Sequence, residues 1–160
     1  METTYAYLAG AIDLDGFISI DRRAGRQGMG YRPRIGISDT SPVVPKLLHS
    51  LFQGRLFEIA PKKSSYAHFY LWEAQHQQSR EPLLRLLPYL RLKRRHAELA
   101  LTLIDLVERQ NVGRFLSNPL SAEEDAASRR LYDEVARLNA GRRRRKHRVQ
   151  APDDTSRSGP

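Results

Sequence analysis

Two aspartates lie close together near the start of the chain, in the segment Leu8-Ala-Gly-Ala-Ile-Asp-Leu-Asp-Gly16. Asp13 and Asp15 follow an apolar stretch that predicts a short helix over residues 4–14, and a helix C-terminus disfavours each negative charge by about 0.3–1 kcal/mol. Gly10 costs about 1 kcal/mol relative to alanine inside a helix. A close helix–helix contact and carboxylates placed for a hard cation would explain these residues. An acidic C-terminal turn with an unrelated glycine explains them equally well.

The rest of the chain offers few other routes to chemistry. The absence of cysteine excludes disulfides, thiol nucleophiles and thiolate zinc sites. The five histidines lack metal-ligand spacing, and the chain contains no P-loop, GxGxxG, HExxH or GxSxG motif. Carboxylate chemistry at residues 8–16 is therefore the remaining candidate.

The positive charge of the chain is concentrated in two segments. Lysine and arginine number 27 against 18 acids, for a net charge of +9. Residues 17–72 hold nine bases and three acids, and residues 141–160 hold seven bases and two acids. A basic excess inside a folded segment favours a polyanionic partner, most often nucleic acid. Without a signal sequence or a membrane-spanning run, we expect a soluble, intracellular, cytoplasmic protein, with organellar encoding left open.

The pattern of apolar residues predicts one α+β domain over residues 1–140. Period-two alternation predicts a first hairpin (17–23 and 31–38) and a second (55–60 and 66–74), separated by a helix over 43–52. Helical spacing then predicts a helix from residue 79 that Pro88 interrupts, a long helix over 89–110, and a last helix from the capping box at Ser121 to about Asn139. We expect residues 141–160 to form a basic, disordered tail.

The segment LAGAIDLDG resembles the LAGLIDADG motif of the homing endonucleases. Seven of nine letters agree, and the departures, Ala11 and Leu14, are apolar. The order hairpin–helix–hairpin also resembles the family, as do Leu86–Leu101, with its Pro-aromatic-Leu-x-x-Lys pattern, and the closing segment Val135–Asn139. The resemblance covers about residues 5–140. It implies an α-β-β-α-β-β-α fold with a four-stranded, antiparallel, saddle-shaped sheet.

The number of motifs bears on assembly. Residues 101–109 contain the letters LID but no following acidic pattern, so the chain carries a single motif. In the family, one motif implies a C2 homodimer, whose contact would here involve Ala9, Gly10 and Asp13. The resemblance thus implies an enzyme that cuts both strands of a long, pseudo-palindromic DNA site by metal-dependent phosphodiester hydrolysis.

The resemblance also implies catalytic residues. Asp15 would bind Mg²⁺ (or Mn²⁺), Leu14 would add only its main-chain carbonyl, and Lys93 would stabilise charge near the reacting phosphate. Without the resemblance, the run with Arg91, Arg94 and Arg95 favours a solvated base at Lys93. Asp39, after the second strand, matches a polar position that varies within the family. No small-molecule cofactor and no membrane partner are expected.

One sheet face would contact double-stranded DNA, where arginine can read guanine edges in the major groove. The residues expected on that face are Ser19, Asp21, Arg23, Arg32, Arg34, Lys62, Lys63, His68 and Tyr70. A solvated face with incidental arginines is the structural alternative. Two other functions remain open, a non-catalytic sequence-specific DNA-binding module and an RNA-binding intron-splicing cofactor of the same fold.

Overall fold

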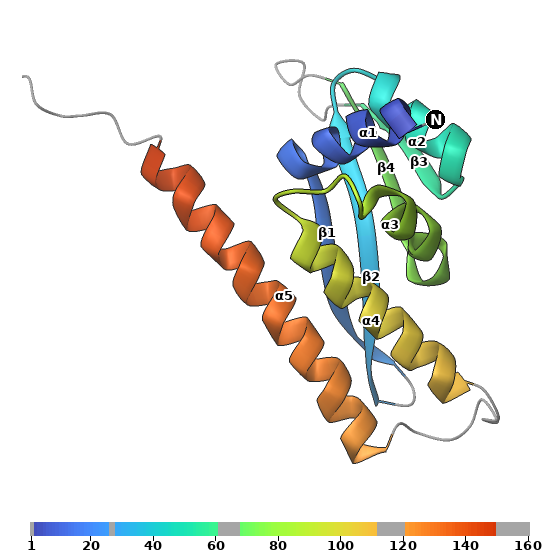
Figure 1. The fold of residues 1–160 in the computed structure, drawn as a ribbon, viewed down its shortest axis with the longest axis vertical. Coiled ribbons are helices and arrows are strands. Elements are labelled where there is room, and N and C mark those ends of the chain that lie inside the picture. The colour runs from blue at the N-terminus through green and yellow to red at the C-terminus, as the bar shows by residue number, and fades with distance from the viewer. Residues whose placement is uncertain (1, 26–27, 61–67, 112–120, 150–160) are drawn as a thin grey trace, which may run out of the picture.

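The computed structural model describes residues 2–25, 28–60, 68–111 and 121–149. Its elements, in chain order, are α1 (Glu2–Leu14), β1 (Gly16–Gly25), β2 (Gly28–Asp39), α2 (Val43–Phe52), β3 (Arg55–Ile59), β4 (Phe69–Gln75), the 3-10 helix η1 (His76–Ser79), α3 (Arg80–Leu86), α4 (Arg94–Asn111) and α5 (Ala122–Val149). Figure 1 shows α1 and α4 crossing in front of the strands. The predicted α+β class and the two hairpins are confirmed.

The four strands form one antiparallel sheet in the order β1-β2-β4-β3. Ile18 lies opposite Ile35, and Ile37 lies opposite Trp72, so the largest apolar side chains of three strands share a face. We call this the core face and the opposite one the open face. Alternation along each strand sends every second residue to the open face.

The described helices pack against the core face only. The main cluster joins Leu8 and Ile12 of α1, Leu48 of α2 and Ala97 of α4 to the sheet, with Trp72 fully buried. A second cluster packs α4 and α5 over the far ends of β1 and β2. The open face therefore remains available to a partner.

The junction between α1 and β1 requires glycine. A Cβ at Gly16 would lie 2.8 Å from the carbonyl oxygen of Gly36 and equally close to Ile12. No side chain fits at that distance, so Gly16 lets the end of α1 contact the sheet directly. This contact fixes the direction in which Asp15 leaves the helix.

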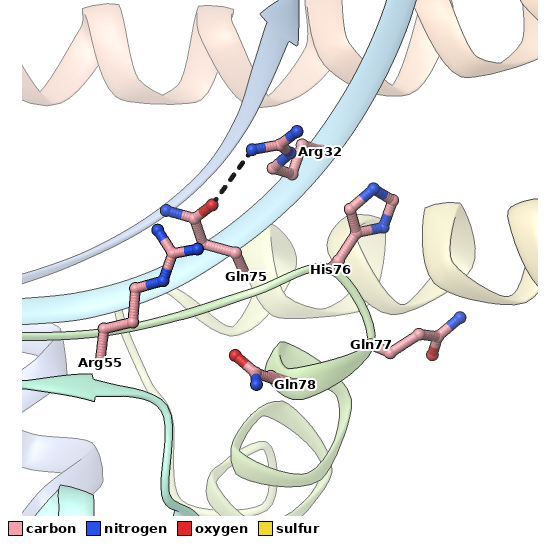
Figure 2. A pocket seen from close by; sticks show the side chains of 6 residues that line it. All are labelled: Arg32, Arg55, Gln75, His76, Gln77 and Gln78. Carbon is pink, nitrogen blue, oxygen red and sulfur yellow. Dashed lines mark hydrogen bonds between the residues drawn. The ribbon is translucent and has the colours of Figure 1, made fainter.

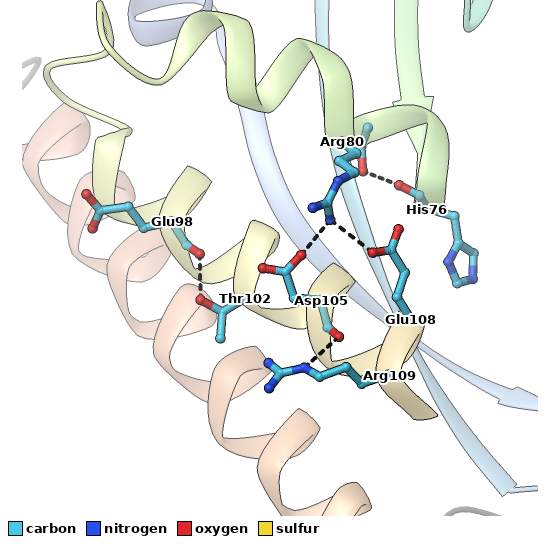
Figure 3. Close-up of polar contacts among 8 residues, drawn as sticks. His76, Arg80, Glu98, Thr102, Asp105, Glu108 and Arg109 are labelled. Atoms are coloured by element: carbon cyan, nitrogen blue, oxygen red, sulfur yellow. Dashed lines mark hydrogen bonds and ion pairs between the residues drawn. The ribbon is translucent and has the colours of Figure 1, made fainter. Parts of the chain in front are cut away.

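The predicted long helix is shorter at its start. α4 begins at Arg94, because Pro88 ends the preceding helical turn and residues 91–93 form a bend. α3 is tied to α4 by Arg80, whose guanidinium contacts Asp105 at 2.5 Å and Glu108 at 3.2 Å (Figure 3). These ion pairs are part-exposed, so each contributes little stability on its own.

The last helix is longer than predicted. α5 continues through the basic residues to Val149, ten residues beyond the expected end at Asn139. Arginine and lysine are strong helix formers that also suit the negative end of the helix dipole, and this outweighs the cost of Gly141. The C-terminal part of α5 stands apart from the other elements in Figure 1. No helix in the described ranges is both long and apolar enough to cross a membrane.

Candidate active site and nucleic-acid interface

Asp13 and Lys93 join the end of α1 to the start of α4. The Asp13 carboxylate accepts hydrogen bonds from three backbone N–H groups, those of Arg91 (2.6 Å), Leu92 (3.1 Å) and Lys93 (2.8 Å). In return, the Lys93 ammonium donates to the carbonyl oxygens of Ile12 and, at 2.6 Å, of Asp13. We call this arrangement the helix lock.

The helix lock explains why an acid is tolerated at the end of α1. Asp13 supplies negative charge to the N-terminal end of α4, and Lys93 supplies positive charge to the C-terminal end of α1, so both helix dipoles are complemented. Both side chains are buried, with 5% and 4% of their residue surface exposed. Lys93 is thus neither the solvated base of the structural alternative nor a side chain that extends freely from the surface.

Asp15 lies just beyond the helix lock. It is exposed, and its backbone N–H donates to the carbonyl of Ala11 at 2.9 Å, which continues the helical turn. Leu14 is 66% exposed beside it. The Asp15 carboxylate is therefore accessible while its backbone is held.

Asp39 occupies a turn at the end of β2. Its carboxylate accepts the N–H of Ser41 at 2.9 Å, a local bond typical of an aspartate that begins a turn. By the register, Asp39 lies on the core-face side, opposite Tyr70. Its described contacts are those of a turn residue.

Of the three residues predicted at a subunit contact, only Gly10 is exposed. A Cβ at Gly10 would meet nothing within 4 Å, whereas Ala9 is fully buried in the core of its own chain. Asp13 is committed to the helix lock. An exposed α1 surface therefore runs along Gly10 and Leu14.

The open face carries a connected polar network across three strands. Arg34 binds Asp21 of β1 at 2.7 Å and Glu73 of β4, and its guanidinium lies 5.2 Å from the centre of the Phe17 ring. Burial opposes its charged form, but the hydrogen bonds to Glu73 and Asp21 raise the pKa of Arg34 above its usual value. Arg34 is consequently neutralised by two carboxylates and is a poor candidate for direct base readout.

Arg32 has a different environment on the same face. It donates to Gln75 at 3.3 Å, and Gln75 in turn donates to Glu73 at 2.7 Å. Its guanidinium is oriented by a neutral partner and keeps its charge available for DNA. Ser19 and Arg23 also lie on the open face, as the sequence predicted.

Two of the predicted DNA contacts lie on the other side of the sheet. Tyr70 shares the core face with buried Trp72, and Lys46 of α2 lies 5.8 Å from the centre of its ring. His68 stacks on Tyr70 with ring centres 5.5 Å apart. The sequence was ambiguous here because both sets of alternating residues contain aromatic side chains. Lys62 and Lys63 lie outside the described residues.

A hollow on the open face joins Arg32, which the sequence predicted as a DNA contact, to five residues that the sequence did not single out. Its volume is about 340 Å³, and it is lined by Arg32, Arg55, Gln75, His76, Gln77 and Gln78 (Figure 2). Burial and the charge of Arg32 lower the pKa of His76. Arg55 pairs with Glu73 in the strand register and so belongs to the open face. A hollow lined by two cations and three amides suits a phosphate or a base edge.

Asp15 would need further oxygen ligands to bind a divalent metal ion. Among the described residues, no group of three or more histidine, aspartate or glutamate side chains lies close enough to hold an ion. One exposed carboxylate per chain fits the hard-ion requirement of Mg²⁺ only if further oxygens come from a second chain, from phosphates and from water.

The comparisons with known proteins bear on the fold of the chain. No protein-family model matches the sequence, and none of the curated proteins matches it. Solved structures are similar in fold. The homing endonuclease I-CvuI, in complex with its target in the presence of calcium, is 21% identical, with a TM-score of 0.64 over 86% of this chain and 82% of that chain.

Two further structures match over similar lengths. The archaeal intron-encoded homing endonuclease I-Vdi141I, complexed with DNA, is 14% identical, with a TM-score of 0.67 over 86% of this chain and 84% of that one. The homing endonuclease I-TnaI is 14% identical, with a TM-score of 0.60 over 85% and 93%. The chain therefore has the fold of the LAGLIDADG homing endonucleases.

Proposed function

We propose that this protein is a homodimeric, site-specific endonuclease that cuts double-stranded DNA by metal-dependent hydrolysis. The observation that supports it best is the placement of Asp15. This exposed carboxylate lies between α1, whose end the helix lock holds, and β1 of the sheet, in a fold shared with homing endonucleases bound to DNA.

Asp15 is the proposed metal ligand, with one copy from each subunit and the Leu14 carbonyl as an additional oxygen donor. A bound Mg²⁺ ion, or Mn²⁺ in its place, would activate water and stabilise the leaving oxygen. The residues of the chain itself would contribute by holding the Asp15 carboxylate in position. The helix lock holds the end of α1, and Gly16 brings that end against the sheet, so the carboxylate is positioned relative to any DNA on the open face.

Lys93 acts in this proposal as a positioning residue. Its ammonium is bonded to carbonyls of α1, so its charge stabilises the helix end from which Asp15 projects. Asp39 would stabilise the turn that it caps at the end of β2. From the resemblance to the family, we also propose that Asp39 positions a water molecule.

The open face is the proposed DNA-binding surface. Arg23, Arg32 and Arg55 offer positive charge there. Arg34 pairs with both Asp21 and Glu73 and cancels one of their two negative charges, which weakens the repulsion of phosphates. Electrostatic attraction between these arginines and the DNA phosphates would supply much of the affinity. Side chains on the open face that contact base edges would distinguish one DNA sequence from another.

Asp15→Asn tests the proposal. The change preserves size and removes the charge that would hold a cation, so we expect cleavage of a target-bearing plasmid in Mg²⁺ to be abolished while gel-shift affinity in Ca²⁺ persists. Glu81→Gln, which neutralises an exposed carboxylate on α3 that has no proposed role, is the matched comparison and should cut at the parental rate. An Asp15→Asn variant that still cuts at the parental rate would refute the catalytic role of Asp15.

The parent protein distinguishes the two alternative functions. Specific DNA binding without cleavage would support the DNA-binding module, and selective binding to RNA would support the splicing cofactor.

A further inference from the structure

An apolar cluster lies on the open face of the second hairpin. Phe57 lies opposite Leu71, and Ile59 lies opposite Phe69, and residues directly opposite one another share a face. Their neighbours Leu56 and Trp72 point into the core, which places these four side chains on the other side. Phe57 is 40% exposed. We call these four residues the hairpin patch.

The hairpin patch has no counterpart among the described helices, because all of them pack on the core face. It is also directly beside positive charge. Arg55 is two residues from Phe57 on the same strand and face, and within the described ranges no carboxylate forms an ion pair with it. A suitable partner must therefore present apolar groups next to negative charge.

Duplex DNA provides that combination in its major groove. Thymine is the base that exposes a methyl group there, close to the phosphates that would pair with Arg55. We propose that the hairpin patch contacts thymine 5-methyl groups and makes this chain select thymine at defined positions of its target. This proposal rests on the proposed function, in that it takes DNA to be the ligand of the open face.

The sheet order places this selection away from the cutting site. β3 is separated from β1, and hence from Asp15, by three strand spacings, or about 14 Å. The thymines in contact with the hairpin patch should accordingly lie in the outer part of each half-site, several base pairs from the scissile phosphates.

Uracil substitution tests the proposal directly, because uracil differs from thymine only by the absence of the methyl group. A target selected from a randomised DNA pool is resynthesised with uracil at one thymine position at a time, and binding is measured in Ca²⁺. We expect at least one outer position per half-site to lose affinity by about fourfold, the equivalent of one methyl group removed from a buried contact.

Substitutions in the protein test whether the hairpin patch causes the preference for thymine over uracil. Phe57→Ala should bind the thymine target more weakly and should no longer distinguish it from the uracil target. Val43→Ala is the matched control, because Val43 is a 61% exposed apolar residue on α2 and should leave the discrimination intact. The uracil series on the parent protein remains decisive if Phe57→Ala does not fold.

Two failures are distinguishable. Specific DNA binding that is indifferent to uracil at every position, or discrimination that persists in folded Phe57→Ala, would overturn the thymine proposal and leave the endonuclease proposal standing. Absence of any sequence-specific DNA binding by the parent protein would overturn the proposed function and this proposal together.

Discussion

Asp13 and Asp15 are two positions apart and have opposite environments. Asp13 is buried and accepts three backbone N–H groups, whereas Asp15 is exposed at the helix end. The difference arises because consecutive positions of a helix point about 100° apart, so a separation of two turns the side chain from the core towards solvent. One acid thus serves the fold and leaves the other free for chemistry.

Asp13→Ala should destabilise the protein by about 3 kcal/mol, because it leaves buried N–H groups at the start of α4 without their charged acceptor. Urea unfolding followed by circular dichroism measures the change in the free energy of unfolding. Asp15→Ala is the control and should leave the free energy of unfolding unchanged or slightly higher, since it removes a negative charge from a helix C-terminus. Equal destabilisation by the two variants would contradict this division of roles.

At the scale of elements, the polar network couples β1, β2 and β4 through a single side chain. Arg34 contacts Asp21 and Glu73, and the Glu73 side chain is only 7% exposed. A carboxylate buried to this extent depends on its partner, because its desolvation is not otherwise compensated. Arg34 is therefore a structural residue of the sheet, whereas the side-chain hydrogen bond of Arg32 goes to the neutral Gln75.

Arg34→Met should lower the free energy of unfolding by about 2 kcal/mol, less than for a fully buried pair because Arg34 itself is 25% exposed. Adding Glu73→Gln to that variant should restore part of the stability. Arg32→Met, the matched control, should leave stability almost unchanged and weaken DNA binding. Thermal unfolding and gel-shift titration of the three variants distinguish the roles, and a stable Arg34→Met with weakened DNA affinity would reverse them.

Helix α5 extends well beyond the part that packs on the sheet. Val135 is buried in the second cluster, and the Asn139 amide donates to the carbonyl of Ile18 at 3.4 Å. The helix then continues through a run of basic residues to Val149. The basic run therefore begins on a helix that is already anchored to β1.

Removal of residues 141–160 should leave the fold intact, because the packed part of α5 is retained. We expect the salt dependence of DNA binding to flatten by about 0.9 in slope for each phosphate that the deleted residues neutralise, with the preferred sequence unchanged. Affinity measured from low to high salt, followed by target selection with the truncated protein, provides the data. A changed site preference would show that the basic segment reads bases.

At the scale of the whole molecule, one chain presents one Asp15, while cutting a duplex requires action on two strands. The exposed α1 surface at Gly10 and Leu14 adjoins that carboxylate. A C2 contact between two such surfaces would bring both carboxylates to the symmetry axis. The expected assembly is thus a dimer with a pseudo-palindromic target.

The free protein should have twice the 18.4 kDa mass of the chain by light scattering at micromolar concentration. Gly10→Leu should shift it to the monomer, since a side chain at Gly10 meets nothing within its own chain but would separate two closely packed helices. Gly10→Ala is the conservative comparison and should preserve the circular dichroism spectrum. A monomeric parent that still cuts DNA would contradict the dimer.

The amino-acid sequence was enough to predict the α+β class, both hairpins, the helix that ends in two aspartates and the arginine-bearing face of the first hairpin. These follow from local patterns: period-two alternation, helix caps and the position of the glycines. The same patterns were insufficient where two interpretations were locally equivalent. The second hairpin has aromatic residues in both alternating sets, and the pairing of Ile37 with Trp72 was needed to place Tyr70 on the core face and Phe57 on the open face.

Charged residues whose partners are distant in sequence take their roles from the folded chain. Lys93 reaches carbonyls about eighty positions away, and Arg34 meets Glu73 across two paired strands. Whether a charge is buried and paired or free to meet a ligand depends on which groups the folded chain brings within about 3 Å, and no local pattern contains that distance. Helix α5 differs in this respect, because its extension beyond Asn139 to Val149 follows from the local helix propensity of its arginines and lysine.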